Sequence, residues 1–241
     1  MAVKFEFLEI SSSNIKFALH SNVSFANALR RILLSEISCL AIEYVEISEN
    51  TSVFADESIS HRLGLLPLED NISLLDKNSC NCENYCCKCA IIFNLGKTNN
   101  TSENINIYGT DLTIENKDLS LSLNQVLICK LAPKQKIVLK GIARRNPSGL
   151  ISHVKYCPVT AVSFTYDEGN LKKHTNLWRE NDETVAESWP FVEDRADIYD
   201  TSSVERVVMN VEVVEGVGKP KDILLKALSV YKKKFEAFLD F

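Results

Sequence analysis

Five cysteines stand within ten positions, at residues 80–89, and this cluster constrains its region more than any other feature of the chain. Four of them, Cys80, Cys82, Cys86 and Cys89, follow the spacing Cys-x-Cys-x3-Cys-x2-Cys. Four thiolates in so short a loop can surround a tetrahedral zinc ion. The intervening residues are mostly polar, so the loop has no core of its own, and ligation would supply the ordering energy that burial cannot. The spacing therefore predicts one zinc ion held by these four cysteines.

The fifth cysteine, Cys87, leaves a second ligand set open. It could replace Cys86, but Cys86 and Cys89 keep the two-residue spacing that is common in zinc sites, so we favour Cys86. The loop contains no histidine, and four thiolates leave no open coordination position, so the pattern favours a structural zinc over a catalytic one. Free, unligated cysteines are the alternative interpretation. We expect the three isolated cysteines in the core: Cys39, Cys129 and Cys157.

The composition excludes several classes of protein. The chain has 241 residues, is 45% apolar and carries a net charge of −5, which is typical of a globular protein with one large or two small domains. Its basic clusters are short and lack the repeated aromatics of a single-strand platform, so direct nucleic-acid binding is not favoured. These clusters are Arg30-Arg31, Arg144-Arg145, Lys172-Lys173 and residues 232–234.

Nothing at the start of the chain resembles a targeting segment. Residues 1–10 carry charges where a signal peptide has its apolar core. No run approaches the ~18 apolar residues of a membrane span. We therefore expect an intracellular, soluble protein that does not contact a membrane.

The hydrophobic pattern predicts a strand-rich chain. Residues 3–10 mostly alternate and predict a strand with one buried face, and residues 14–19 predict its hairpin partner across a turn at 11–13. Further strands are predicted at residues 41–47, 90–95, 105–108, 112–114, 126–131, 136–142, 160–166 and 205–215. Residues 96–103 have the composition of a surface loop, and residues 171–200 that of an ordered loop.

Two helices are predicted ahead of the cysteine cluster. Residues 24–38 form the first, with Ser24 as the candidate N-cap. Its apolar face contains Phe25, Ala28, Leu29, Ile32 and Leu33. Leu34 falls opposite that face, where a helix packed on one side needs no leucine. The second helix covers residues 56–63 and ends at Gly64, a typical residue just after a helix.

The last helix is the most strongly predicted, over residues 219–241, with Pro220 in its first turn. Its apolar positions spread over an arc of about 180°. They are Ile223, Leu224, Ala227, Leu228, Val230, Tyr231, Phe235, Phe238, Leu239 and Phe241. A helix lying on its own sheet needs little more than half that width, so the excess apolar surface is expected to meet another chain. Burial between two elements of the same chain is the alternative.

Catalytic signatures are absent from the sequence. There is no Gly-rich phosphate loop, serine nucleophile elbow or His-Glu-x-x-His motif. The four histidines are scattered, and Glu57 with His61 has the spacing of an ordinary ion pair on a helix surface. We therefore expect no enzymatic activity from the chain itself.

Several segments resemble a known family. Residues 25–37, FANALRRILLSEI, resemble the first-helix motif of the RNA polymerase alpha-like subunits, a family that includes bacterial alpha, its archaeal counterpart and the eukaryotic equivalents. Residues 55–68, ADESISHRLGLLPL, resemble the archaeal and eukaryotic signature that follows it. The cysteine loop and residues 126–131 and 171–175 are similar to the branch that holds the third-largest subunit of eukaryotic RNA polymerase II.

This resemblance implies an α+β fold with a discontinuous dimerisation domain, made of an antiparallel sheet and two helices. Residues 1–39 and 166–241 would form that domain, with the C-terminal helix at 220–240. A β-rich domain would be inserted at residues 40–165 and carry the zinc loop at 80–89. The composition change along the middle of the chain fits such an insertion.

The resemblance also implies a function. The chain would be a non-catalytic assembly subunit of DNA-directed RNA polymerase II in the nucleus, which heterodimerises with a smaller alpha-like subunit. The heterodimer would dock the second-largest subunit and the small zinc-bearing subunits. Arg30 and Arg31 are the candidate residues for contacting the second-largest subunit. The chain would meet nucleic acid only through the complex. The predicted interface comprises Phe25, Leu29, Arg30, Arg31, Leu33, Leu34, Leu224, Leu228, Tyr231, Phe235 and Phe238.

Two alternatives remain beside that function. One is the equivalent subunit shared by RNA polymerases I and III, which the intact zinc loop makes less favoured. The other is a stand-alone zinc-binding protein. The chain has no second, ferredoxin-type cysteine cluster, which argues against the archaeal versions that carry an iron–sulfur cluster.

Overall fold

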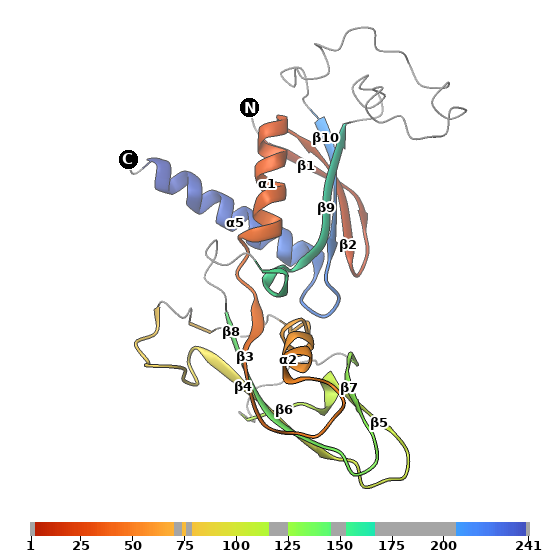
Figure 1. The fold of residues 1–241 in the computed structure, drawn as a ribbon. Helices are drawn as coiled ribbons and strands as arrows, with labels where there is room; N and C mark the ends of the chain where they lie inside the picture. Colours follow the sequence, from red (N-terminus) through yellow and green to blue (C-terminus); the bar gives the residue numbers. More distant parts are fainter. Residues whose placement is uncertain are drawn as a thin grey trace, which may run out of the picture. The chain divides into compact units, whose positions relative to one another are not determined.

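The computed structural model describes residues 3–69, 74–75, 79–115, 125–145, 153–166 and 206–239 (Figure 1). The chain divides into two compact units. Unit 1 contains Met1–Leu34, Val159–Val213 and Lys219–Phe241, and unit 2 contains Ser35–Pro158 and Val214–Gly218. The ordered loop predicted at residues 171–200 lies outside the described residues.

Unit 1 is built on a four-stranded antiparallel sheet in the order β1-β2-β10-β9. Its strands are β1 (Lys4–Ile10), β2 (Asn14–His20), β9 (Val159–Tyr166) and β10 (Arg206–Val213). The predicted first hairpin is confirmed, and the Asn14 N–H donates to Ser11 Oγ at 2.9 Å within its turn. Strand β9 falls within the segment at residues 40–165 that was expected to form the inserted domain, but its hydrogen bonds with β10 place it in unit 1. Hydrophobic alternation identifies a strand but not its partner.

Strand β1 is far more exposed than its alternating sequence predicts. Phe5 is partly buried, but Phe7, Leu8 and Ile10 are each close to half exposed. The strand lies at the edge of the sheet, and its register shifts between Phe7 and Glu9. The prediction of one buried face was therefore wrong for this chain taken alone, because an edge strand is not covered on the core side as fully as a central strand.

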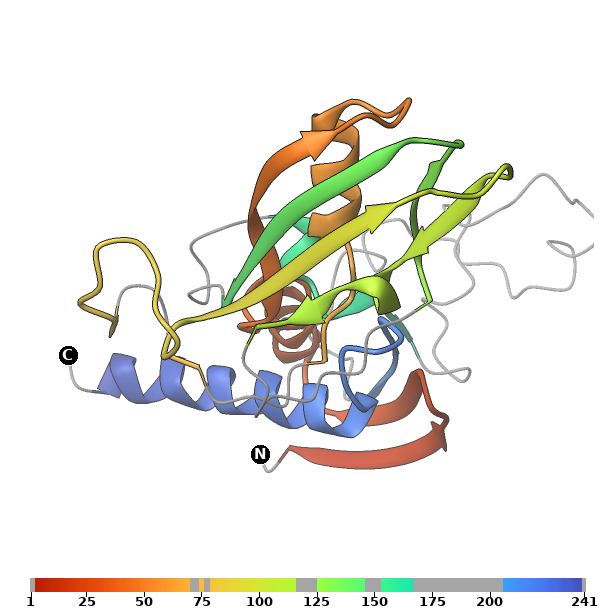
Figure 2. The ribbon, with the colours of Figure 1, turned by 90° about the horizontal axis from the view of Figure 1, so that it is seen from below.

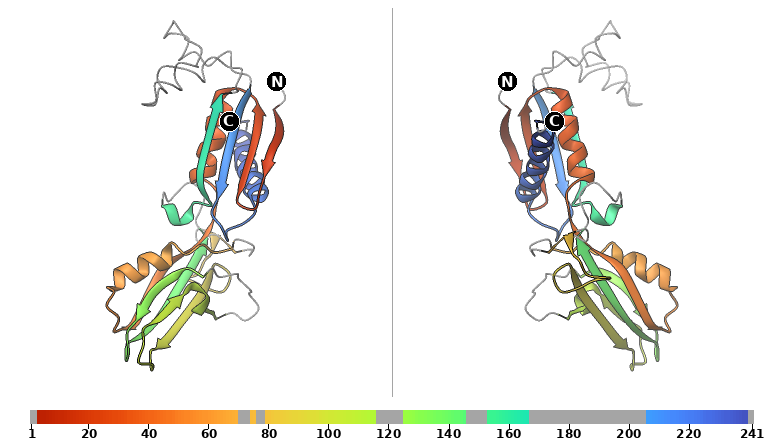
Figure 3. Two further views of the ribbon diagram at one scale, coloured as in Figure 1. Left: turned by 90° about the vertical axis from the view of Figure 1, so that its right-hand side faces the viewer. Right: turned by 90° about the vertical axis from the view of Figure 1, so that its left-hand side faces the viewer.

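Two helices cover one face of this sheet (Figure 3): α1 (Val23–Ser35) and α5 (Pro220–Leu239). The N-cap of α1 is Asn22 and not Ser24, since Asn22 Oδ1 accepts from the Phe25 N–H at 2.9 Å. The buried face of α1 comprises Ala26, Leu29, Ile32 and Leu33. The face is thus rotated from the predicted one, with Phe25 and Ala28 only partly buried. The helix also ends three residues earlier than predicted.

Unit 2 contains a four-stranded antiparallel sheet in the order β3-β8-β4-β6 and a two-stranded sheet of β5 and β7 (Figure 2). The strands are β3 (Leu40–Asn50), β4 (Ala90–Thr98), β5 (Ile105–Tyr108), β6 (Thr113–Ile114), β7 (Leu127–Leu131) and β8 (Lys136–Arg145). Two 3-10 turns accompany them, η2 (Gly109–Asp111) and η3 (Val154–Tyr156). The predicted strands are confirmed, although β3, β4 and β8 run beyond their predicted ends.

The core of unit 2 lies between the large sheet, helix α2 (Asp56–Gly64) and the two-stranded sheet. Its fully buried side chains include Ile42, Ile59, Leu63 and Phe93. Gly64 belongs to α2, and the C-cap is Leu65 with right-handed backbone angles, so the prediction that Gly64 follows the helix was wrong. A right-handed cap does not require glycine.

The loop predicted at residues 96–103 is shorter than expected. Strand β4 continues to Thr98 because the whole segment from Ala90 pairs with β8. The next residue, Asn99, is buried, and its side chain donates to the carbonyl oxygens of Glu103 at 2.7 Å and Leu131 at 2.9 Å. Tertiary hydrogen bonds thus order a segment whose polar composition predicts a surface loop.

Two of the three isolated cysteines, Cys39 and Cys129, are buried as predicted, while Cys157 is only partly buried. Among the described residues, we find no helix with the length and apolar character needed to cross a membrane.

Candidate metal centre and apolar helix surface

The cysteine loop (residues 80–89) precedes β4 and is closed by a tight turn. The N–H groups of Cys89 and Ala90 both donate to the Cys86 carbonyl, at 3.1 and 3.0 Å. Cys89 is buried, whereas Cys80, Cys82 and Cys86 are partly exposed and pack with it around Ile142 of β8. This face of the sheet is opposite to the one that α2 covers, because the core residues of β8 occupy the alternate positions 139 and 143.

The four predicted ligands converge on one point. The Sγ atoms of Cys80, Cys82, Cys86 and Cys89 all lie within 4.8 Å of one another. Four of their separations are 3.5, 3.5, 3.5 and 3.8 Å. Tetrahedral ligands at about 2.3 Å from a zinc ion stand roughly 3.8 Å apart, so the cluster fits a tetrathiolate metal centre. The fifth cysteine, Cys87, is exposed and does not belong to this group.

The thiols of the cluster differ in acidity. The pKa of Cys86 is lowered to about 7, first by a backbone hydrogen bond from Lys88 and then by its contact with Cys80. The pKa of Cys82 is raised to about 12, first by its hydrogen bonds with Cys80 and Cys89. Burial raises the pKa of Cys89. Because a metal ion takes thiolates, binding to this cluster would release protons.

Two basic side chains of β8 contact the cysteine loop. Lys140 Nζ of β8 donates to the Tyr85 hydroxyl at 3.0 Å, and this hydrogen bond raises the pKa of Lys140. Arg144, also on β8, is buried and donates to the Asn84 carbonyl oxygen. Neither contact was anticipated from the sequence, where Arg144 and Arg145 form a short basic pair without an assigned role.

The distal segment of α5 (residues 232–239) presents a second unusual surface. Every residue in it is exposed, and Phe235, Phe238 and Leu239 are 53%, 77% and 85% exposed. The Tyr231 ring packs edge-on against both Phe235 and Phe25, with ring centroids 4.9 and 4.8 Å apart. The first half of α5 is anchored by four buried residues: Pro220, Ile223, Leu224 and Ala227. The helix is therefore anchored at one end and uncovered at the other.

The predicted interface residues separate into three groups. Leu29, Leu33 and Leu224 are buried inside unit 1 and have no surface for a partner in this conformation. The partly exposed group is Phe25, Arg30, Leu34, Leu228 and Tyr231, and the exposed group is Arg31, Phe235 and Phe238. Arg30 donates to Asn27 Oδ1 through two nitrogens, at 3.2 and 2.9 Å.

Sequence reasoning missed part of the apolar surface. Leu225 is 64% exposed on α5, and the exposed residues Phe7, Leu8 and Ile10 lie along β1. The signal for β1 was present, because three apolar residues within four positions break strict alternation.

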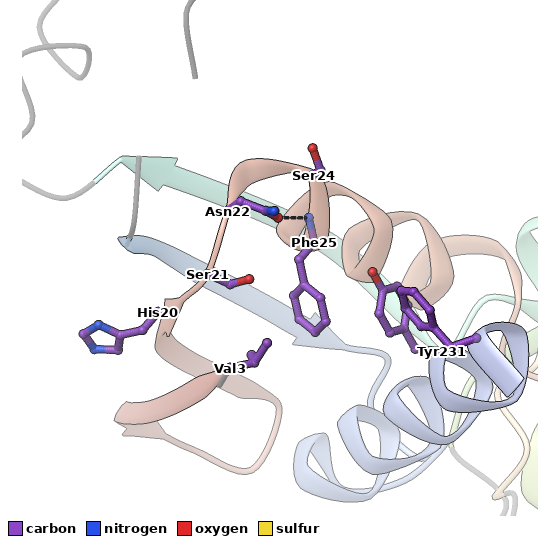
Figure 4. A pocket seen from close by; sticks show the side chains of 8 residues that line it. Val3, His20, Ser21, Asn22, Ser24, Phe25 and Tyr231 are labelled. Atoms are coloured by element: carbon purple, nitrogen blue, oxygen red, sulfur yellow. Dashed lines mark hydrogen bonds between the residues drawn. The ribbon is translucent and has the colours of Figure 1, made fainter. Parts of the chain in front are cut away.

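A cavity of about 450 Å³ opens beside the start of α1 (Figure 4). Its apolar wall is formed by Val3, Phe25, Tyr231 and Phe235, and its polar wall by His20, Ser21, Asn22 and Ser24. His20 Nε2 lies 3.3 Å from Glu6 Oε2. The paired rings of Tyr231 and Phe235 on α5 thus form part of the cavity wall.

Comparisons with known proteins agree with the resemblance. The family model described as the RNA polymerase Rpb3/Rpb11 dimerisation domain matches residues 20–235. The DNA-directed RNA polymerase II subunit RPB3 of Schizosaccharomyces pombe is 36% identical over 196 residues, which cover 75% of this chain and 65% of the relative. Subunit 3 of DNA-directed RNA polymerases II, IV and V of Arabidopsis thaliana is 32% identical over 183 residues, covering 68% and 57%.

An archaeal relative also matches. The DNA-directed RNA polymerase subunit Rpo3 of Methanothermobacter thermautotrophicus is 33% identical over 148 residues, which cover 60% of this chain and 54% of the relative. The chain spans less than two thirds of the length of each of these relatives. Because the family model covers most of the chain, the chain belongs to the RNA polymerase Rpb3/Rpb11 dimerisation domain family.

Proposed function

We propose that the chain is a non-catalytic assembly subunit of DNA-directed RNA polymerase II that works in the nucleus. The observation that carries the proposal is the match of the dimerisation-domain family over residues 20–235. It is supported by relatives from a fungus, a plant and an archaeon that are named as polymerase subunits. The equivalent subunit of polymerases I and III is the competing assignment.

In this proposal the chain forms a heterodimer with a smaller alpha-like subunit through α1 and α5. Phe25, Tyr231, Phe235 and Phe238 supply the apolar contact in this proposal. The rings of Phe25, Tyr231 and Phe235 pack in sequence, and Phe238 is exposed one turn further along α5. Aromatic side chains are enriched among the residues that dominate binding energy at interfaces. Leu29, Leu33 and Leu224 take an indirect part by holding the two helices on the sheet.

The heterodimer then forms the platform for the second-largest subunit and the small zinc-bearing subunits. Arg31 and Arg30 are the proposed contacts to the large subunit, because the guanidinium fork suits polar subunit interfaces. Nucleic acid is met only through the assembled complex. A discontinuous dimerisation domain with an inserted β-rich domain is the corresponding fold, and the division into units 1 and 2 supports it.

One structural zinc ion completes the proposal. Cys80, Cys82, Cys86 and Cys89 would hold it, because their sulfurs have tetrahedral spacing and thiolates are preferred zinc ligands. Such an ion would order the loop and would not take part in a reaction.

Purification of the tagged chain from its own cells tests the assembly role. We expect the two largest subunits of RNA polymerase II and one smaller alpha-like subunit to copurify. Recovery of the large subunits of polymerases I and III would support the competing assignment. A monodisperse, stable monomer with no polymerase subunits would contradict both assignments and leave a stand-alone zinc-binding protein.

A further inference from the structure

The guanidinium of Arg144 is buried beside the cysteine loop, and one of its three nitrogens has no hydrogen-bond partner among the described residues. The residue is 4% exposed, and the nitrogen without a partner is Nε. Arg144 Nη1 lies 3.7 Å from Oε2 of Glu43. The guanidinium lies 5.5 Å from the ring centroid of Tyr44 and 5.9 Å from that of Tyr85. Burying a cation is costly unless nearby groups offset its charge.

Two cations from one strand hold the same tyrosine of the loop. Lys140 Nζ lies 3.0 Å from the Tyr85 hydroxyl and 5.2 Å from its ring centroid. Arg144 contacts the same ring and donates to the carbonyl of the preceding residue, Asn84. Residues 140, 142 and 144 of β8 share one face of the sheet. Ile142, between the two cations, packs against the cysteines.

Four thiolates around a divalent ion carry a net double negative charge. Such a centre is more stable where cations and hydrogen-bond donors surround it, because these groups orient the ligands and offset the charge. We propose that Arg144, Lys140 and Tyr85 form a clamp that holds the cysteine loop on β8 and offsets the charge of the metal centre. The clamp rests on the metal-binding role proposed above, and Arg144 and Lys140 are positioning residues within it.

The clamp explains two observations together. It gives the buried Arg144 a second source of negative charge beyond Glu43, and it gives a polar loop without a core an attachment to the sheet. Both cations act through the segment at residues 84–85, which joins the second ligand, Cys82, to the third, Cys86. Without the clamp, the four cysteines would therefore remain available as ligands, but their positions would be less well fixed.

Cobalt titration of the reduced full-length chain tests this proposal. Absorption bands of cobalt–thiolate coordination report the ligand set, and competition with a chelator reports the affinity. We expect Arg144→Met to bind cobalt about 10- to 100-fold more weakly, with the same bands at saturation. Lys140→Met should weaken binding less, because Lys140 is more exposed. The matched control is Arg62→Met, since Arg62 also donates to a carbonyl, that of Ile128 at 2.8 Å, and covers the Phe54 ring.

The outcomes separate the clamp from the metal site itself. Affinities of Arg144→Met and Lys140→Met within twofold of the unchanged chain would overturn the clamp and leave the metal site standing. Absence of thiolate bands in the unchanged chain would overturn the metal site. If Arg144→Met does not fold, Tyr85→Phe carries the test, because it removes only the hydroxyl to which Lys140 donates. It should weaken cobalt binding by more than about twofold, and an affinity within about twofold of the unchanged chain would overturn the clamp.

Discussion

The cysteine loop and the distal segment of α5 both lack a core of their own, but they differ in what can complete them. In the loop, four sulfurs converge within 4.8 Å, so a single ion can satisfy all of them. Along α5, Phe235, Phe238 and Leu239 are exposed among the described residues, and we propose that the surface of another molecule covers them. Metal binding by the loop depends on a fixed set of sulfur atoms, whereas partner binding by the helix would depend on the apolar area that is buried. Substitution of a loop cysteine should therefore abolish metal binding almost completely, whereas substitutions on α5 should weaken partner binding in a graded way.

The largest effect is expected from Cys82→Ser. The metal content of this variant should fall from one zinc per chain to nearly none. A hydroxyl is a poor zinc ligand, and three thiolates do not complete the four-coordinate site. Elemental analysis of the purified variants measures this. Cys87→Ser is the control and should keep one zinc. The ligand set would be wrong if Cys87→Ser lost the metal and Cys82→Ser retained it.

A large but incomplete loss of affinity for the smaller alpha-like subunit is expected from Phe238→Glu. A charge in the centre of the uncovered apolar face should weaken the heterodimer by about 30- to 1000-fold, the effect of removing a residue that dominates an interface. Titration of the variant with the smaller alpha-like subunit measures the affinity. Ser229→Glu adds the same charge to an exposed position of α5 outside the apolar arc and should leave the affinity nearly unchanged. Equal affinities for both variants would remove the distal segment from the interface.

A smaller effect is expected where α1 begins. Asn22→Ala removes the side chain that caps the Phe25 N–H, which should lower the free energy of unfolding by about 1 kcal/mol. Urea denaturation measures the change, and Ser24→Ala is the control, with a change below about 0.5 kcal/mol. The metal content should stay at one zinc per chain in both variants, since the cap lies in unit 1 and the cysteines in unit 2. A larger effect of Ser24→Ala would restore Ser24 as the cap.

The smallest effect is expected from removal of the metal by a chelator. The affinity for the smaller alpha-like subunit should change by less than about threefold, because the loop and α5 belong to different compact units and rely on different interactions. The same titration on the zinc-loaded and chelated chain measures it. A loss of more than about tenfold would show that the two regions are energetically coupled and would end the distinction between them.

Much of the fold could be predicted because its elements have clear periodicity. The last helix begins at Pro220 as predicted, and the first hairpin turns where its three serines predict. Three other features could not be predicted, since they depend on neighbours that are distant in sequence. These are the pairing of β9 with β10, the burial of Asn99 in a segment predicted as a surface loop, and the burial of Leu224 inside unit 1.

The sequence alone determined that a cysteine cluster lies at residues 80–89 and how wide the apolar arc on the last helix is, because both follow from spacing along the chain. The structure brings together Cys80, Cys82, Cys86 and Cys89 and leaves Cys87 outside the group. Only the tertiary structure decided which apolar side chains remain uncovered. It also decided that Arg144 and Lys140 meet Tyr85 of the cysteine loop. The physical reason is the same in both cases. A sheet brings together residues about 60 positions apart, as it does Asn84 and Arg144, and no local pattern records such contacts.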